Sequence, residues 1–236
     1  MKQHKWILFI LILFSRLAAE DLFKASVYLK DSDPPQLLFL HHNEILEFDE
    51  GMKLRHYYLH PDSTVSVLDE VILQQNEFLR SRSEFYDVLE TGEIVRYGDL
   101  MKMRFTDNGR NKEAVFPWNP DILLGPLFND FILKNWEKLT SGQKVDFFLP
   151  APDILKIASF NIQEDLNNKY VKNGMIVFKM NVSSIFLKLL VRPSYFVYDL
   201  SSSRLQSIHG TTILRSKVNN KWQRTTDVDI YYQYKD

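Results

Sequence analysis

Four histidines between residues 41 and 60 are of a type that could support chemistry: His41, His42, His56 and His60. Imidazole is a common zinc ligand. His56 and His60 have the i, i+4 spacing that a helix would need, but segment 53–59 alternates like a strand and Pro61 follows. On a strand these two side chains would share a face about 13 Å apart, beyond the reach of one ion. We therefore expect no metal site.

Two groups of carboxylates are the other polar candidates. Asp227 and Asp229 fall on the polar face of the last predicted strand, close enough for a calcium ion or a carboxylate pair. A second acidic group flanks a predicted turn and consists of Glu44, Glu47, Asp49 and Glu50. Solvated surface carboxylates explain both groups equally well, so neither defines a site by itself.

Motifs of the common enzyme classes are absent from the sequence. There is no Gly-x-Ser-x-Gly elbow, phosphate-binding loop, dinucleotide fingerprint or His-Glu-x-x-His. The chain has no cysteine, which excludes disulfides, thiolate metal sites and a cysteine nucleophile. We predict a protein without catalytic residues or cofactors that is not an enzyme. A hydrolase whose carboxylates meet only in the folded chain is the alternative.

Short strands are the elements that must position any site. Between Leu37 and Phe116, apolar and polar residues alternate in short runs, and Thr91-Gly92 and Asn108-Gly109 are the hairpin signals between them. In segment 176–182 the apolar residues alternate strictly: Ile176, Phe178, Met180 and Val182. The predicted fold is mainly β (α+β), a curved antiparallel sheet or half-barrel.

One long amphipathic helix is expected to cover the apolar face of that sheet. The proline-rich segment 117–126 ends the first run of strands, and Pro126 suits a first helical turn. From Gly125 to about Leu139, apolar residues recur at helical spacing: Leu124, Leu127, Phe128, Phe131, Ile132, Trp136 and Leu139. Segment 117–126 is also the one sub-boundary within the predicted domain.

The N-terminus has the pattern of a secretory signal. Lys2 and Lys5 precede an apolar run of nine residues, Trp6–Phe14, and the small residues Ala18-Ala19 suit a cleavage site. We predict that residues 1–19 are cleaved and that 20–236 form a single β-rich domain in the bacterial periplasm. An uncleaved N-terminal anchor is the alternative. The net charge of −1 provides no basic field, so nucleic acid is not an expected partner.

The segment "SSIFLKLLVRP", Ser183 to Pro193, is the most apolar stretch after the signal. It suggests a lip at the mouth of a cavity, with Lys188 and Arg192 facing a headgroup or a membrane surface. A short core helix or a buried strand explains the same residues.

The exported N-terminus, strand-rich body, single covering helix and "SSIFLKLLVRPSYFVYD" segment together resemble bacterial envelope half-barrel proteins, among them the periplasmic lipoprotein and lipid carriers. The resemblance is one of layout and covers most of the mature chain. It implies an apolar concave surface that shields acyl chains from water. The resemblance includes no motif from which functional residues could be assigned to positions of this chain.

The sequence therefore predicts an exported protein that binds an apolar ligand, a lipid or acyl chain, between sheet and helix. The expected ligand-binding residues are Phe128, Phe131, Ile132, Trp136, Phe178, Met180, Phe186, Leu187 and Leu190. An envelope protein partner and peripheral membrane contact are further expectations. The alternative is a structural or interaction protein of the envelope with a closed core.

Overall fold

The computed structural model describes residues 23–183, 192–218, 221–223 and 226–234. Strands dominate this part of the chain: β1 (Phe23–Leu29), β2 (Leu37–Phe48), β3 (Gly51–Leu59), β4 (Val65–Gln74), β5 (Glu77–Phe85), β6 (Glu90–Tyr97), β7 (Leu100–Asp107), β8 (Arg110–Pro117), β9 (Val145–Ala151), β10 (Lys156–Glu164), β11 (Met175–Val182), β12 (Ser194–Asp199), β13 (Leu205–Thr212), β14 (Ser216–Val218), β15 (Lys221–Gln223) and β16 (Thr226–Tyr234). The helical elements are η1 (Tyr86–Val88), η2 (Gly125–Leu127), α1 (Phe128–Lys134), α2 (Trp136–Thr140) and η3 (Pro152–Ile154).

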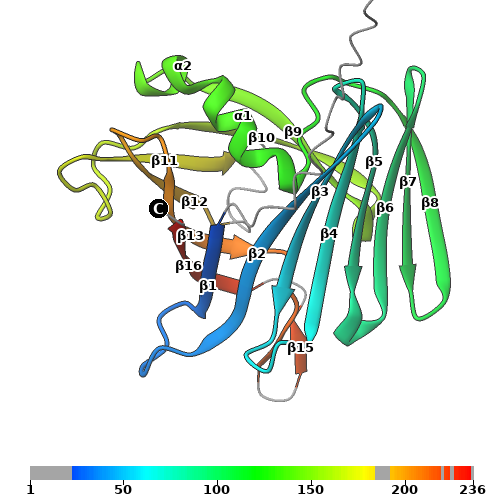
Figure 1. Cartoon of the computed structure of the whole chain (residues 1–236), viewed down its shortest axis with the longest axis horizontal. Coiled ribbons are helices and arrows are strands. Elements are labelled where there is room, and N and C mark those ends of the chain that lie inside the picture. The colour runs from blue at the N-terminus through cyan, green and yellow to red at the C-terminus, as the bar shows by residue number, and fades with distance from the viewer. Residues whose placement is uncertain (1–22, 184–191, 219–220, 224–225, 235–236) are drawn as a thin grey trace, which may run out of the picture.

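Fourteen of the described strands form one antiparallel sheet in the order β8-β7-β6-β5-β4-β3-β2-β1-β16-β13-β12-β11-β10-β9. Strands β2 to β8 are successive hairpins and form the N-terminal half, and β9 to β13 with β16 form the C-terminal half. Pairing of β1 with both β2 and β16 joins the halves. The sheet is open, with β8 and β9 at its edges, and it bends so that the halves enclose an interior (Figure 1). The prediction of a mainly β, antiparallel fold is confirmed.

Charge pairing on the outer face supports the register of the N-terminal half. One residue from each of β2 to β8 falls in a single cross-strand row that alternates in charge: Glu44, Arg55, Glu70, Arg82, Glu93, Arg104 and Glu113. Opposite charges on paired strand residues contribute roughly 0.2–1 kcal/mol each. A slip of one residue between two strands would turn these side chains toward the apolar interior. The row therefore favours one register.

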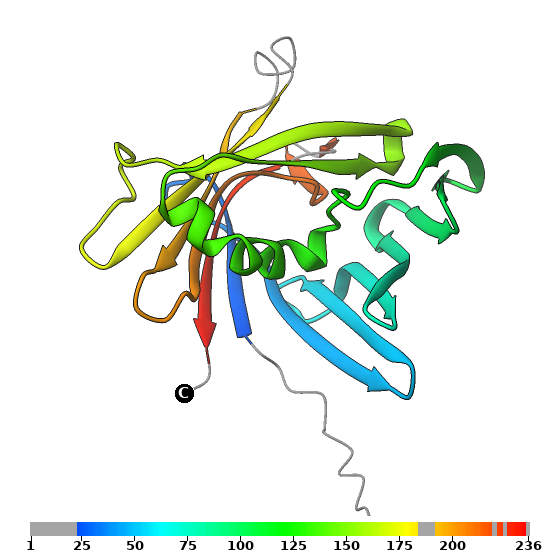
Figure 2. The same ribbon diagram turned by 90° about the horizontal axis from the view of Figure 1, so that it is seen from above.

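The helical segment covers the inner face of the C-terminal half, as Figure 2 shows from above. It is not the single long helix that the sequence predicts. α1 has seven residues and α2 has five, and Asn135 separates them with φ −104° and ψ 15°. The Asn135 side-chain amide donates to the carbonyl oxygen of Phe131 at 2.9 Å. Such side-chain bonds to the backbone compete with regular helical bonding, and the helix is interrupted here.

One of the two hairpin predictions is confirmed and the other is wrong. Asn108 and Gly109 have φ of 47° and 79° and connect β7 to β8, as a primed turn requires. Gly92 instead lies inside β6. A Cβ at Gly92 would come within 3.3 Å of Cβ of Pro152, so the missing side chain makes room for η3. The glycine serves close packing rather than a turn.

Three contacts hold the two halves together around the interior. η3 packs on β6 and β7, and η2 packs on β3 and β4. After β13 the chain crosses back to β6, where Nη2 of Arg215 donates to Oε2 of Glu90 at 2.7 Å. Both members of this pair are buried. These contacts join segments far apart in the sequence.

The predicted signal, residues 1–19, lies outside the described residues. Within the described ranges, none of the helices is both long and apolar enough to span a membrane.

Candidate functional site

Six of the predicted ligand-binding residues come together in one packed cluster on the inner face of the C-terminal half. Phe128 stacks on Phe196 with ring centroids 4.5 Å apart, and Trp136 meets Phe178 edge-on at 5.6 Å. Ile132 and Phe178 are fully buried, while Phe131 and Met180 are partly buried against the same cluster. These side chains pack closely against one another. The other three, Phe186, Leu187 and Leu190, lie outside the described residues.

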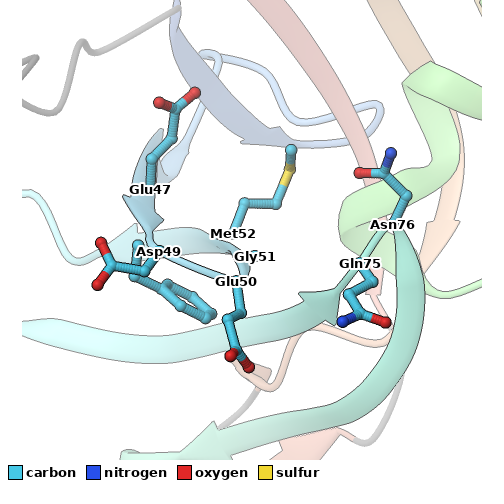
Figure 3. A pocket seen from close by; sticks show the side chains of 8 residues that line it. Glu47, Asp49, Glu50, Gly51, Met52, Gln75 and Asn76 are labelled. Atoms are coloured by element: carbon cyan, nitrogen blue, oxygen red, sulfur yellow. The ribbon is translucent and has the colours of Figure 1, made fainter.

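A surface pocket lies at neighbouring hairpin ends, away from that cluster. It measures about 410 Å³ and is lined by the β2–β3 turn and the β4–β5 turn: Glu47, Phe48, Asp49, Glu50, Gly51, Met52, Gln75 and Asn76 (Figure 3). Three of the four predicted acidic residues are therefore exposed here, and the fourth, Glu44, pairs with Arg55 at 3.5 Å. This arrangement agrees with solvated surface carboxylates.

A row of polar residues crosses the inner face of the N-terminal half. The sequence pattern did not indicate this row. Directly paired residues of β2 to β5 form it: Asn43, His56, Asp69 and Ser83. The hydroxyl of Ser83 donates to Oδ1 of Asp69 at 2.8 Å. On β4, Asp69 lies between the core residues Val67 and Val71, so the row interrupts the apolar core there.

A small interior pocket of about 60 Å³ adjoins this row. Tyr58, Asp69 and Ser83 supply its polar groups, and Val67, Phe85 and Leu214 supply apolar walls. Thr212 and Ile213 complete the lining, and Ile213 is 59% exposed. The pocket therefore lies between the two halves of the sheet, next to the point where the chain leaves β13.

Burial changes the ionisation of the groups along the row. It raises the pKa of the Asp69 carboxyl to about 6, against the opposing effect of the Ser83 hydrogen bond. Burial lowers the pKa of His56 to about 4. For His41 burial, helped by the neighbouring His56 and His42, holds the pKa well below its usual value. The two buried imidazoles are therefore neutral at pH 7.

Two buried polar atoms on β2 lack hydrogen-bond partners within the described residues: Nδ1 of His41 and Oδ1 of Asn43. Nε2 of His41 lies 3.2 Å from Nδ1 of His56, and the His41 ring stacks on Tyr58 at 4.3 Å. Unpartnered buried atoms are uncommon in native proteins. They mark this part of the interior as a place that can accept a polar partner.

The remaining histidines of the N-terminal half are separated from the row. The ring of His42 stacks on Tyr57 on the outer face, at 4.9 Å. Nε2 of His60 lies 3.0 Å from the Asp87 carboxylate. Among the described residues no group of three or more His, Cys, Asp or Glu is arranged to hold a metal ion.

A second polar arrangement lies on the outer face of the C-terminal half. Oγ of Ser207 lies 2.9 Å from Nε2 of His209, and Nδ1 of His209 lies 2.7 Å from Oδ1 of Asp229. Ser207 and His209 are two apart on β13, and Asp229 is the β16 residue directly paired with His209. The sequence analysis selected Asp229 but not its partners. The Ser-x-His spacing within a strand was the only available signal.

Asp227 and Asp229, which the sequence places on one strand face, have different partners in the structure. Asp227 accepts a hydrogen bond from Thr211 and an ion pair from Nη1 of Arg192 at 3.2 Å. Asp229 contacts His209.

Comparison with known proteins finds no match: no family model, no curated protein and no solved structure is similar to this chain.

Proposed function

We propose that this chain is an exported binding protein for a small amphiphilic ligand, held in the pocket between the two halves of the sheet. The observation that carries the proposal is the combination at that pocket of a buried carboxyl, Asp69, with the apolar walls of Val67, Phe85 and Leu214. A pocket with few convergent polar groups and a perturbed pKa is the usual form of a ligand site.

The size and chemistry of the pocket define the ligand. About 60 Å³ is roughly twice the volume that a water molecule occupies in the liquid, enough for a head group and the one or two carbon atoms next to it. Asp69 is ionised above about pH 6, and an ionised carboxylate only accepts hydrogen bonds. A head that donates hydrogen bonds, an ammonium or a hydroxyl, is therefore favoured over a carboxylate. The apolar part of the ligand would leave past Ile213.

A series of eight-carbon probes tests this proposal. Octylamine, octanol and octanoate are titrated at pH 7.5 into the mature protein by isothermal calorimetry. We expect the amine to bind most tightly and octanoate least. Asp69→Asn should weaken the binding of octylamine by about 10- to 100-fold, which corresponds to one charge-assisted hydrogen bond. Asp121→Asn, at an exposed position, should leave the affinity unchanged. Octanoate binding as tightly as octylamine would rule the site out.

The packed aromatic cluster under α1 and α2 favours a second candidate, the interaction protein with a closed core. Ile132 and Leu139 have no exposed area, so these two side chains are not available to a ligand. Native mass spectrometry of the protein from an envelope fraction separates the two candidates. An extractable bound mass supports the binding protein, and a bare chain that takes up none of the probes supports the interaction protein. N-terminal sequencing of the same sample tests cleavage after Ala19.

A further inference from the structure

Hydrogen-bond geometry gives defined roles to the three residues on the outer face of β13 and β16. A carboxylate only accepts, so the 2.7 Å contact with Asp229 places the imidazole proton of His209 on Nδ1. Nε2 is then the acceptor of the Ser207 hydroxyl proton, at 2.9 Å. We propose that Ser207 is a nucleophile for acyl transfer, with His209 as its general base and Asp229 as the residue that positions the imidazole.

The surroundings of His209 keep it available as a base. Its ring stacks on Tyr170 with centroids 3.7 Å apart and planes 6° apart. Burial lowers the pKa of His209, Lys30 and Lys169 act in the same direction, and the bond to Asp229 opposes them. The imidazole is therefore neutral at pH 7, the form that accepts a proton.

The substrate class follows from the groups that share this face. The ring of Tyr231 meets the His209 ring edge-on at 5.8 Å and is 48% exposed, so it offers an apolar surface beside the nucleophile. Lys30 and Lys169 lie near enough to act electrostatically on the His209 ring. Positive charge stabilises the oxyanion that forms when a carbonyl is attacked. The site suits an ester with an apolar group that packs on Tyr231.

The reaction balances with water as the second substrate. Ser207 Oγ forms a bond to the carbonyl carbon while its proton moves to Nε2 of His209, and the alcohol leaves with that proton when the ester bond breaks. Water then attacks the acyl-serine and gives one proton to Nε2, which returns it to Oγ as the acid leaves.

Tyr170 limits access to the nucleophile. Ser207 is 7% exposed and His209 is 3% exposed. Tyr170 belongs to the connection between β10 and β11, residues 165–174, and its ring lies over the imidazole. Removal of this ring should expose the serine without touching the hydrogen bonds to Asp229.

Labelling with a fluorophosphonate tests the proposal directly. Ser207 Oγ would form a bond to phosphorus, fluoride would leave, and His209 would take the proton. The full mature chain is incubated with the probe, and the adduct is located by peptide mass spectrometry. We expect a single adduct on Ser207, labelled at least 10-fold faster in Tyr170→Ala and at least 10-fold slower in Asp229→Asn. Ser207→Ala should give no adduct and no hydrolysis of p-nitrophenyl acetate.

Two controls are needed to interpret the labelling result. Ser194→Ala removes a buried serine of the neighbouring strand β12 and should label like the wild type. Circular dichroism and the unfolding midpoint establish that each variant is folded. No adduct on Ser207 in either folded wild type or folded Tyr170→Ala would overturn the proposal. An unchanged rate of adduct formation in folded Asp229→Asn would overturn the role of Asp229 in positioning the imidazole.

Discussion

Glu90→Gln should be among the most destabilising single changes in this protein, because it leaves Arg215 charged and buried. The guanidinium donates to Oε2 of Glu90 from both Nε, at 2.9 Å, and Nη2, at 2.7 Å. Its exposed fraction is 4%, and its Cζ lies 4.5 Å from the Phe85 ring centroid. Removing one partner of such a pair destabilises by about 3–5 kcal/mol. A glutamine amide still accepts one hydrogen bond, so we expect a loss of about 3 kcal/mol, which is roughly 6–12 °C in Tm for a chain of this size.

Urea unfolding followed by tryptophan fluorescence and circular dichroism measures this loss. Glu113→Gln is the matched control, because its side chain is 53% exposed and its partners are Lys102 and Arg104 on the outer face. Exposed pairs of this kind contribute about 0–1 kcal/mol. Replacing both Glu90 and Arg215 by methionine should recover most of the stability. A loss below about 1 kcal/mol for Glu90→Gln, or a double variant less stable than that single one, would refute the reasoning.

Three further predictions concern the interior and one hairpin. Burial raises the pKa of Asp69 from 3.8 to about 6, so the folded state holds this proton more tightly, and the contribution of Asp69 to stability falls as pH rises through that window. The unfolding free energy of Asp69→Asn minus that of the wild type should therefore increase between pH 4 and pH 7. A difference that stays constant over this range would contradict the prediction. Leu139→Ala, at a fully buried position, should cost about 2–5 kcal/mol in urea unfolding, against less than about 0.5 for Leu133→Ala at a position 41% exposed. Gly51→Ala should destabilise by about 1–3 kcal/mol, because the added Cβ would overlap the carbonyl oxygen of Leu73; thermal unfolding equal to wild type would show that the hairpin shifts freely.

Much of the sheet was predictable because strand signals are local. Alternation in segments such as 176–182 and the Asn108-Gly109 turn identify strands and one hairpin without knowledge of their neighbours. The helix was predictable in position but not in length. Apolar spacing continues through Asn135, and the bond from its side chain to Phe131 that accompanies the break is not visible in that spacing.

The candidate sites were less predictable than the fold. Asp69 is followed by Glu70 in β4, and nothing in this local sequence indicates that Ser83 and Tyr58 lie beside Asp69. His209 and Asp229 are separated by 20 residues and become neighbours only through the pairing of β13 with β16. The helix residues predicted to bind a ligand do face the sheet, where their side chains pack against one another.

The sequence by itself determined that this chain is built from antiparallel strands with a helical cover near residues 125–139, since periodicity and turn chemistry act within a few residues, but it predicted that cover as one long helix. The folded structure decided which strands are neighbours and how the halves close. The row from Glu44 to Glu113, the pair of Arg215 with Glu90, and the contact of Ser207, His209 and Asp229 all join residues from different elements of the fold. Such contacts depend on register and on the bend of the whole sheet, which no single segment encodes.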